Sequence, residues 1–243
     1  MARIALLAAL ALAPAVLVAW AQPAPGGLLF ALSFEESCRP TFAVGPTTGD
    51  ASCTLTTGGG GWHGEALIAE RGFRGIEPFL APRYLTAGNI DREQGTVTLA
   101  VQPLPEFFRD AEVLRCLFFS WVEADRKTAP KVFRIDSRQG MLRVFEQDVA
   151  GGNYTNHMTF PIPDWQPGQW HRIVYTWGGG ERVLYLDGAQ VARSAPGRGL
   201  PRLGHEFLVG AGAWGMSPAQ GLIDEVAIYD RPLDADQVRG DAR

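Results

Sequence analysis

The carboxylates are the side chains whose spacing decides whether this chain could cleave a sugar polymer. A retaining glycosidase needs two carboxyl groups about 5–5.5 Å apart, and on one strand residues i and i+2 or i+4 share a face. Glu123 and Asp125 begin such a pattern, but no third carboxylate follows before Pro130. Asp224 and Glu225 are adjacent, so on a strand they point to opposite faces. The sequence therefore predicts no catalytic residues, with an atypical glycosidase or lyase site as the alternative.

Four other residues have the chemistry of a sugar-binding surface, where a flat ring covers the C–H face of a sugar and polar groups bind its hydroxyls. Tyr154 and His157 belong to the polar and aromatic segment 153–157, which we expect to be a loop. Trp165 lies between two prolines, and Trp214 stands among glycines. The alternative for each is loop packing. We expect binding on a concave sheet face or on the loops along one edge.

Short strands are the elements that must position these residues. The predicted strands cover residues 28–35, 96–102, 114–122, 132–135, 141–146, 170–177, 182–186, 189–194, 207–210 and 222–229. Asp187-Gly188 between two of them predicts a β-hairpin. Only the last residues look helical, where Asp234 and Gln237 have the spacing of a capping box. Many short strands without a long amphipathic helix predict a single sandwich or jelly roll.

The first residues predict export. Arg3 precedes an apolar run over residues 4–20, and Ala19-Trp20-Ala21 offers small residues around a cleavage point. We expect residues 1–21 to be a signal peptide and residues 22–27 a linker, which gives a secreted, periplasmic or cell-surface protein without membrane insertion after cleavage. The alternative is a membrane anchor, although the run has the minimum length of a span and Pro14 interrupts it.

Composition and cysteines narrow the chemistry further. The chain has 243 residues, of which 46% are hydrophobic, and a net charge of −4 without a basic run, so no nucleic-acid partner is expected. Export would allow disulfides. Cys38 and Cys53 flank one loop and either form a bridge or do not, whereas Cys116 in an apolar run is expected to be a buried, inert thiol. No cysteine or histidine spacing suggests zinc.

Several segments, taken in order, resemble one family. They are residues 61–67 (GWHGEAL), 88–91 with 94–97 (GNID, QGTV), 170–177 with 184–188 (WHRIVYTW, LYLDG) and 221–229 (GLIDEVAIY). They resemble the laminin-G-like modules of the concanavalin A-like lectin/glucanase superfamily over about residues 28–239. The resemblance implies an all-β fold in which two antiparallel sheets pack as a concanavalin A-like jelly-roll sandwich. It also implies that Trp170 and Trp177 serve mainly as core residues.

The same resemblance implies a function and a metal. Several members hold a structural calcium between the first and last strands, and the matching positions here are Glu35 or Glu36 together with Asp224. The alternative for Asp224 is that it accepts hydrogen bonds from backbone amides at a strand end. A non-catalytic carbohydrate-binding or adhesion module is the expected function, with carbohydrate or an extracellular or cell-surface protein as the partner. The alternatives are a polysaccharide-active enzyme and a structural or protein-interaction domain, because fold does not fix function.

Overall fold

The computed structural model describes residues 26–47, 53–56, 58–70, 81–122, 131–148 and 154–240, without the side chains of Tyr154 and Trp214. The expected signal peptide and most of the expected linker lie outside these residues. Within them no helix has the length and apolar character needed to cross a membrane.

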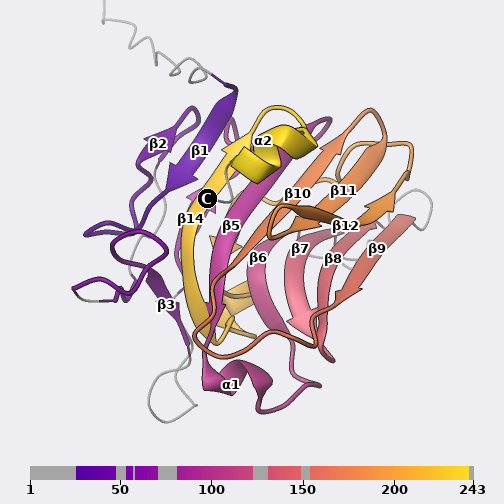
Figure 1. Cartoon of the computed structure of the whole chain (residues 1–243). Coiled ribbons are helices and arrows are strands. Elements are labelled where there is room, and N and C mark those ends of the chain that lie inside the picture. Colours follow the sequence, from indigo (N-terminus) through magenta and orange to yellow (C-terminus); the bar gives the residue numbers. More distant parts are fainter. Residues whose placement is uncertain are drawn as a thin grey trace, which may run out of the picture.

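Two antiparallel sheets form the molecule, as Figure 1 shows. The eight-stranded sheet has the order β12 (Ala189–Ser194), β11 (Glu181–Leu186), β10 (His171–Gly178), β5 (Gly95–Pro103), β14 (Gly221–Tyr229), β1 (Leu28–Leu32) and β2 (Phe42–Ala43), and β3 (Leu67–Ala69) also pairs with β14. The six-stranded sheet has the order β4 (Arg83–Leu85), β13 (Glu206–Val209), β6 (Arg115–Val122), β7 (Lys131–Arg138), β8 (Met141–Asp148) and β9 (Tyr154–Pro161). The helices are α1 (Pro105–Phe108), the 3-10 turn η1 (Ala213–Gly215) and α2 (Ala235–Gly240). The predicted all-β, two-sheet class is confirmed.

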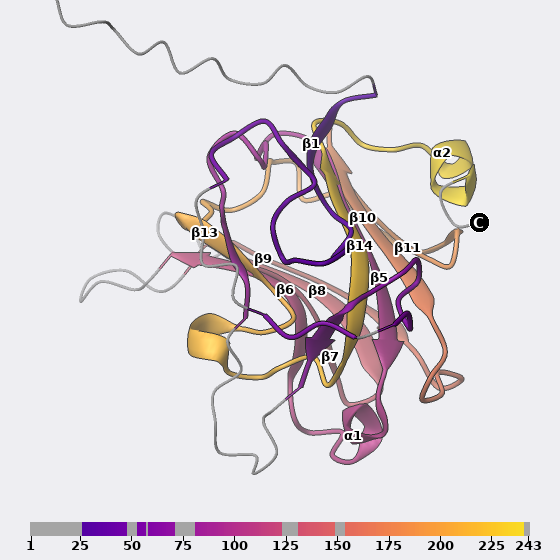
Figure 2. The same ribbon diagram turned by 90° about the vertical axis from the view of Figure 1, so that its left-hand side faces the viewer.

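The sheets lie face to face as two layers, and α2 lies outside the eight-stranded layer (Figure 2). Aromatic rings bridge the layers. Phe30 of β1 meets Phe207 of β13 edge to face at 5.1 Å between ring centroids, and Phe207 stacks on Phe118 of β6 at 5.2 Å. All three side chains are buried, as inward-facing positions of alternating strands should be.

The two tryptophans that were expected in the core differ in their burial. Trp177 is buried in β10, and its Nε1 donates to the Asp91 carbonyl oxygen at 2.9 Å. Trp170 is only half-buried and meets Trp62 edge to face at 6.0 Å. The reason is parity, because residues an odd number apart on an extended segment point to opposite faces. The core expectation was therefore right for Trp177 and wrong for Trp170.

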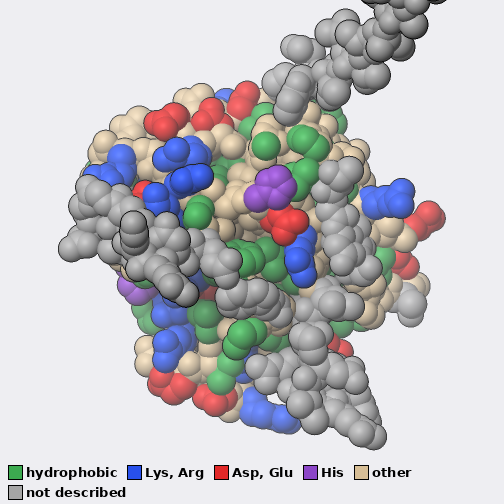
Figure 3. Space-filling view, turned by 180° about the vertical axis from the view of Figure 1, so that it is seen from behind, with side chains coloured by type: hydrophobic (Ala, Val, Ile, Leu, Met, Phe, Trp, Pro, Cys, Tyr) green, Lys and Arg blue, Asp and Glu red, His purple; other side chains and the backbone are tan. Residues whose placement is uncertain are grey.

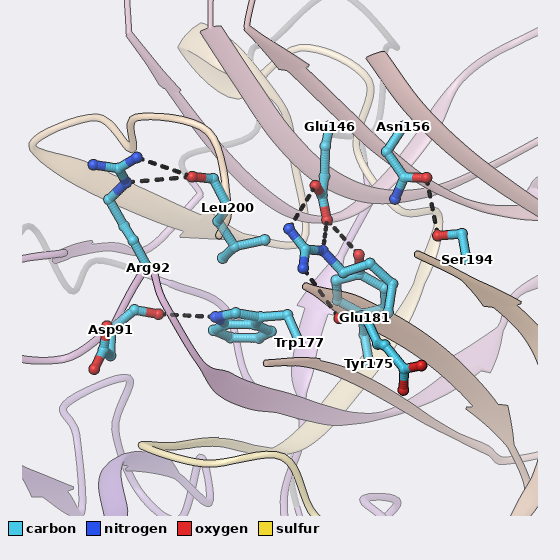
Figure 4. A network of polar contacts seen from close by, with 10 residues as sticks. Asp91, Arg92, Glu146, Asn156, Tyr175, Trp177, Glu181, Ser194 and Leu200 are labelled. Carbon is cyan, nitrogen blue, oxygen red and sulfur yellow. Dashed lines mark hydrogen bonds and ion pairs between the residues drawn. The ribbon is translucent and has the colours of Figure 1, made fainter. Parts of the chain in front are cut away.

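A fully buried ion pair crosses between the sheets. Glu146 of β8 accepts from Nε of Arg182 of β11 at 2.8 Å and from its Nη2 at 3.2 Å, and neither side chain has exposed surface. The Tyr175 hydroxyl donates to the same carboxylate. Figure 4 shows Glu146 and Tyr175 pointing toward one another from opposite sheets. Several hydrogen bonds converge on Glu146, which a charge needs when it is removed from water.

Local signals in the sequence explain two connections. Asp187 and Gly188 have φ angles of 50° and 81°, as a two-residue hairpin turn requires, and they join β11 to β12. Asp234 Oδ1 accepts from the Gln237 amide at 2.8 Å while Gln237 Oε1 accepts from the Asp234 amide at 3.1 Å. This capping box begins α2, which places Val238 in a small apolar cluster with Val174 on the outside of the eight-stranded sheet.

A disulfide joins Cys38 to Cys53, with 6.2 Å between their Cα atoms, while Cys116 is a free and buried thiol. Burial raises the pKa of the Cys116 thiol far above its usual value, which keeps it unreactive.

Removing the disulfide should destabilise the fold, because the bridge limits the freedom of the unfolded chain. The two cysteines are 15 residues apart, and a loop of that length corresponds to about 3 kcal/mol. We expect Cys38→Ala with Cys53→Ala to lower the free energy of urea-induced unfolding by about 2–3 kcal/mol. Reduction of the unaltered protein should give a similar loss, and an unchanged unfolding midpoint in both experiments would contradict the prediction.

Candidate functional site

The outward-facing side chains of the six-stranded sheet line up in rows across its strands. The central row contains Arg83, Leu208, Phe119, Arg134, Phe145 and His157. The charged row beside it contains Cys116, Asp136, Arg143 and Thr159. The third row, on the other side, contains Trp121, Val132, Gln147 and Thr155. Together these three rows form the outer face. They alternate along the strands with residues that point between the sheets, such as Phe133, Ile135 and Val144, and four apolar members of the face are themselves buried, namely Cys116, Phe119, Val132 and Leu208.

A carboxylate bound by two guanidinium groups organises this face. Asp136 has no exposed side-chain surface, and its Oδ2 accepts from Nε of Arg134 at 2.6 Å. Its Oδ1 accepts from Nε of Arg143 at 2.6 Å and lies 2.5 Å from Nη2 of the same residue. The two arginine side chains keep 23% and 13% of their surface exposed. Asp136 therefore fixes two cations at the surface, because charge-assisted bonds of this kind are short and directional.

Aromatic rings lie next to these cations. The guanidinium carbon of Arg134 lies 4.4 Å from the ring centroid of Phe145, which is a cation–π contact. His157 meets the same ring edge to face, with centroids 5.8 Å apart. Phe119 and Trp121 form a second aromatic pair at 5.2 Å, in the row of Arg134 and the row beyond it. The outer face thus combines half-buried rings with fixed hydrogen-bond donors.

His157 adds a neutral polar group at neutral pH. Burial, and after it the positive charge of Arg143, lower the pKa of His157 below its usual 6.5. A neutral imidazole has one donor and one acceptor nitrogen, which suits a sugar hydroxyl.

Positive charge dominates the outer face although the whole chain carries −4. Its three rows hold three arginines and one aspartate. Figure 3 views the molecule from the side of this sheet, with Lys and Arg side chains gathered on the left and hydrophobic side chains across the centre. The local excess of positive charge favours polar or anionic ligands.

Of the predicted sugar-binding residues, His157 lies on the outer face, and Tyr154 and Trp214 lie at its edges. Tyr154 is the first residue of β9, and Trp214 lies in η1, whose preceding Gly212 sits against Cys116 of the charged row. The side chains of Tyr154 and Trp214 lie outside the described residues. The expectation of a loop at residues 153–157 was wrong from Tyr154 onward, because Asn156, Met158 and Phe160 alternate toward the interior of an edge strand.

Trp165 does not join this face. It is buried, its ring stacks on His171 with centroids 4.3 Å apart and planes at 2°, and Phe107 lies 5.9 Å away. Loop packing, the alternative reading of this tryptophan, describes its position in the structure, because a sugar needs an exposed ring face.

Arg134, Asp136, Arg143 and Phe145 were missed from the sequence, although a signal for them exists. Gln139 and Gly140 form a two-residue turn with φ of 56° and 67°. Such a turn fixes the register of its strands, and the register places Asp136 opposite Arg143 and Arg134 opposite Phe145. The predicted strands at 132–135 and 141–146 already flanked this turn. Extending the first of them to the turn would have placed Asp136 opposite Arg143.

Of the predicted metal residues, Asp224 lies in β14 of the other sheet and Glu35 follows β1, and both contact one loop. Asp224 is fully buried at a bulge in β14, and its carboxylate accepts from the backbone amides of His63 at 3.1 Å and Glu225 at 2.8 Å. Desolvation raises the pKa of Asp224 to about 7. Glu35 is exposed, and its Oε1 accepts from the Glu65 amide at 3.3 Å.

The described residues do not fit a metal centre at this place. No group of three or more His, Cys, Asp or Glu side chains within the described ranges is arranged to hold an ion. The Asp224 oxygens are engaged with backbone N–H groups, whereas Ca²⁺ requires six to eight oxygen ligands. Within the described part of the chain, the carboxylates of Glu35 and Asp224 anchor the loop at His63–Glu65 by accepting hydrogen bonds from its backbone amides. Calcium binding stays a prediction from the family resemblance.

Comparison with known proteins gives a family and several similar folds. The family model described as Laminin_G_3, of the concanavalin A-like lectin/glucanases superfamily, matches residues 117–239. No curated protein is significantly similar in sequence. Domain 4 of AbnA, an extracellular arabinanase from Geobacillus stearothermophilus solved with arabinotriose, is 18% identical, with a TM-score of 0.61 over 89% of this chain and 100% of that chain.

Two toxin domains have a similar fold. The receptor-binding domain of botulinum neurotoxin D is 12% identical with a TM-score of 0.65, and the binding domain of Paraclostridial Mosquitocidal Protein 1 is 16% identical with a TM-score of 0.60. Each match covers 89% of this chain and 52% of the other. The chain therefore spans about half the length of these binding domains. At such identities the likeness concerns the fold.

Proposed function

This chain belongs to the concanavalin A-like lectin/glucanase superfamily, and from that premise we propose that it is a non-catalytic module that binds carbohydrate on its outer face. The observation that carries the proposal is the arrangement of Phe145, Arg134 and Arg143 around the buried Asp136. Sugar-binding sites combine an aromatic ring with a few fixed polar groups. Here the strands hold the ring and the donors in one register, so binding requires little reorganisation.

The similar folds support a binding role. The arabinanase domain, whose whole length is matched, was solved with a bound arabinotriose, and the two toxin segments belong to binding domains. Fold likeness alone does not carry a ligand across. It adds to an argument that depends on the outer face itself.

The carboxylates of the outer face argue against hydrolysis. Among the described residues of its three rows, Asp136 is the only carboxylate. Two arginines bind it and it has no exposed surface. A retaining glycosidase would need a second carboxylate about 5–5.5 Å away and access to the substrate. This arrangement favours recognition over cleavage.

The proposal places the protein outside the cytoplasm, in a secreted, periplasmic or cell-surface location. The apolar run at residues 4–20 and the Cys38–Cys53 disulfide support this location, because disulfides persist in oxidising compartments. Fractionation of the native host with detection of the chain would test it, and an exclusively cytoplasmic signal would overturn it.

Phe145→Ala is the direct test of the outer face. We expect the purified chain to retain at least one polysaccharide on an immobilised array, and the variant to bind it about tenfold more weakly, equivalent to about 1.4 kcal/mol. The loss follows from removing both the ring and the surface on which Arg134 rests. Titration calorimetry with the retained polysaccharide measures it.

Trp170→Ala is the matched control, because it removes a half-buried ring from the other sheet. Its binding should equal that of the unaltered chain. Equal affinities for the unaltered chain and a folded Phe145→Ala variant would place the site elsewhere. Absence of binding to every polysaccharide would overturn carbohydrate recognition and leave a protein partner as the working hypothesis.

A further inference from the structure

We propose that the ligand of the outer face is an acidic polysaccharide, and that Arg134 and Arg143 bind the anionic group of its sugar. This inference depends on the proposed function and specifies its ligand class. The shared chemistry is a carboxylate or sulfate group on a sugar ring.

Both arginines keep hydrogen-bond donors at the surface. Arg134 uses Nε for Asp136, and neither of its Nη atoms has a hydrogen-bond partner in the described part of the chain. Arg143 directs Nε and Nη2 at the same carboxylate, and its Nη1 has no partner among the described residues. Both side chains reach solvent. Two fixed guanidinium groups with remaining N–H donors match the planar fork that a carboxylate or sulfate accepts.

The outer face carries an excess of positive charge. Asp136 offsets one of the two guanidinium groups, and Arg83, at the far end of the central row, is exposed. No other carboxylate belongs to the described residues of the three rows. The outer face is therefore positive on a chain of net charge −4. A neutral polysaccharide would gain nothing from this excess, whereas an anionic one would be attracted and then held by bidentate contacts.

Aromatic rings near Arg134 provide surfaces on which a sugar ring can rest. Phe145 lies opposite Arg134 on β8, and Phe119 lies opposite it on β6. The half-buried Trp121 of the third row is two residues along β6 and contacts the Phe119 ring. A sugar whose anionic group reaches the Nη atoms of Arg134 can rest its C–H face on the ring of Phe145 or of Trp121. Alternating ring and cation at neighbouring strands suits a chain of acidic sugars, because successive units can repeat the contact.

Binding to defined polysaccharides tests the inference. The probes are polygalacturonate, dextran sulfate and neutral dextran, each titrated into the full chain at about 50 mM and about 500 mM salt, which shortens the screening length. We expect binding of polygalacturonate or dextran sulfate that weakens in high salt, and none to neutral dextran. The stronger of the two acidic probes identifies whether carboxylate or sulfate is the natural group.

Three variants make the test specific. Arg134→Gln should weaken binding about tenfold or more, and Arg134→Lys should recover only part of it, because lysine keeps the charge without the fork. Arg109→Gln removes the same charge from an exposed site beside α1 and should change nothing. Circular dichroism confirms that each variant is folded.

The outcomes separate this inference from the proposed function. Binding of a neutral polysaccharide that is lost in Phe145→Ala but unchanged in Arg134→Gln would overturn the acidic ligand and leave carbohydrate recognition standing. Equal losses in Arg109→Gln and Arg134→Gln would show general charge attraction and overturn the arginine site. Single-stranded DNA that binds more tightly than either acidic polysaccharide would also overturn it. Absence of binding to any glycan would overturn both.

Discussion

Replacing Glu146 with alanine is expected to lower the free energy of unfolding by about 3–5 kcal/mol, because it removes the carboxylate that binds the fully buried Arg182 guanidinium. Neither side chain has exposed surface, and Tyr175 would lose its acceptor as well. The cost of breaking a buried ion pair exceeds that of any surface contact in this fold. Urea-induced unfolding followed by tryptophan fluorescence measures the loss.

The comparison variants decide whether the loss of this buried ion pair is the cause. Glu181→Ala breaks a solvent-exposed pair with Arg193 and should leave the unfolding midpoint nearly unchanged. Combining Glu146→Leu with Arg182→Met should restore most of the stability, because both charges are then replaced by apolar volume. If Glu146→Ala alone unfolds at the midpoint of the unaltered chain, the pair is not stabilising in the way described here.

Trp177→Ala is expected to cost about 3–5 kcal/mol as well, by opening a cavity in the core. The side chain is fully buried, Gly95 has no Cβ because the indole ring occupies that space, and the indole N–H binds the Asp91 carbonyl. Chemical unfolding at constant protein concentration measures the loss. Binding at the outer face should survive in the folded fraction, since Trp177 belongs to the other sheet.

Trp170→Ala serves again as the matched control, because the same residue type is removed from a half-buried position. Its loss of stability should be clearly smaller. Equal losses for the two tryptophans would contradict the assignment of Trp177 to the core and of Trp170 to the surface.

The fold was readable from the sequence where local chemistry decides the structure. Asp187-Gly188 provided a turn that forces its flanking strands together, and Asp234 with Gln237 specified a helix start. Both depend on residues within a few positions of one another. The longer strands of the eight-stranded sheet were predicted for the same reason, since their alternation is visible along the chain, whereas the short β2 and β3 were not predicted.

The rest depends on contacts between distant residues. Glu146 lies on a strand where its charge would ordinarily indicate an outward face, and its partners Arg182 and Tyr175 on the opposite sheet explain its burial. The inward Asn156 hides the alternation of β9 in the same way, because Ser194 of β12 provides its hydrogen bond across the sheets. The outer face depends on the register of several strands, since its rings and cations come from β6, β7, β8 and β9, although Arg143 and Phe145 share β8.

The pairing of β1 with β14 constrains how this protein assembles. Leu28 pairs with Tyr229, so the eight-stranded sheet closes between the beginning and the end of the described chain. Such pairing forms slowly, because the entropy lost in closing a long loop is offset only after the contacts between the two strands have formed. During synthesis β1 can pair with the short β2 early, but it gains β14 as its neighbour only after nearly the whole described chain has been made. Until that pairing forms, the strands already made expose apolar faces, and this exposure makes the incomplete chain prone to aggregation.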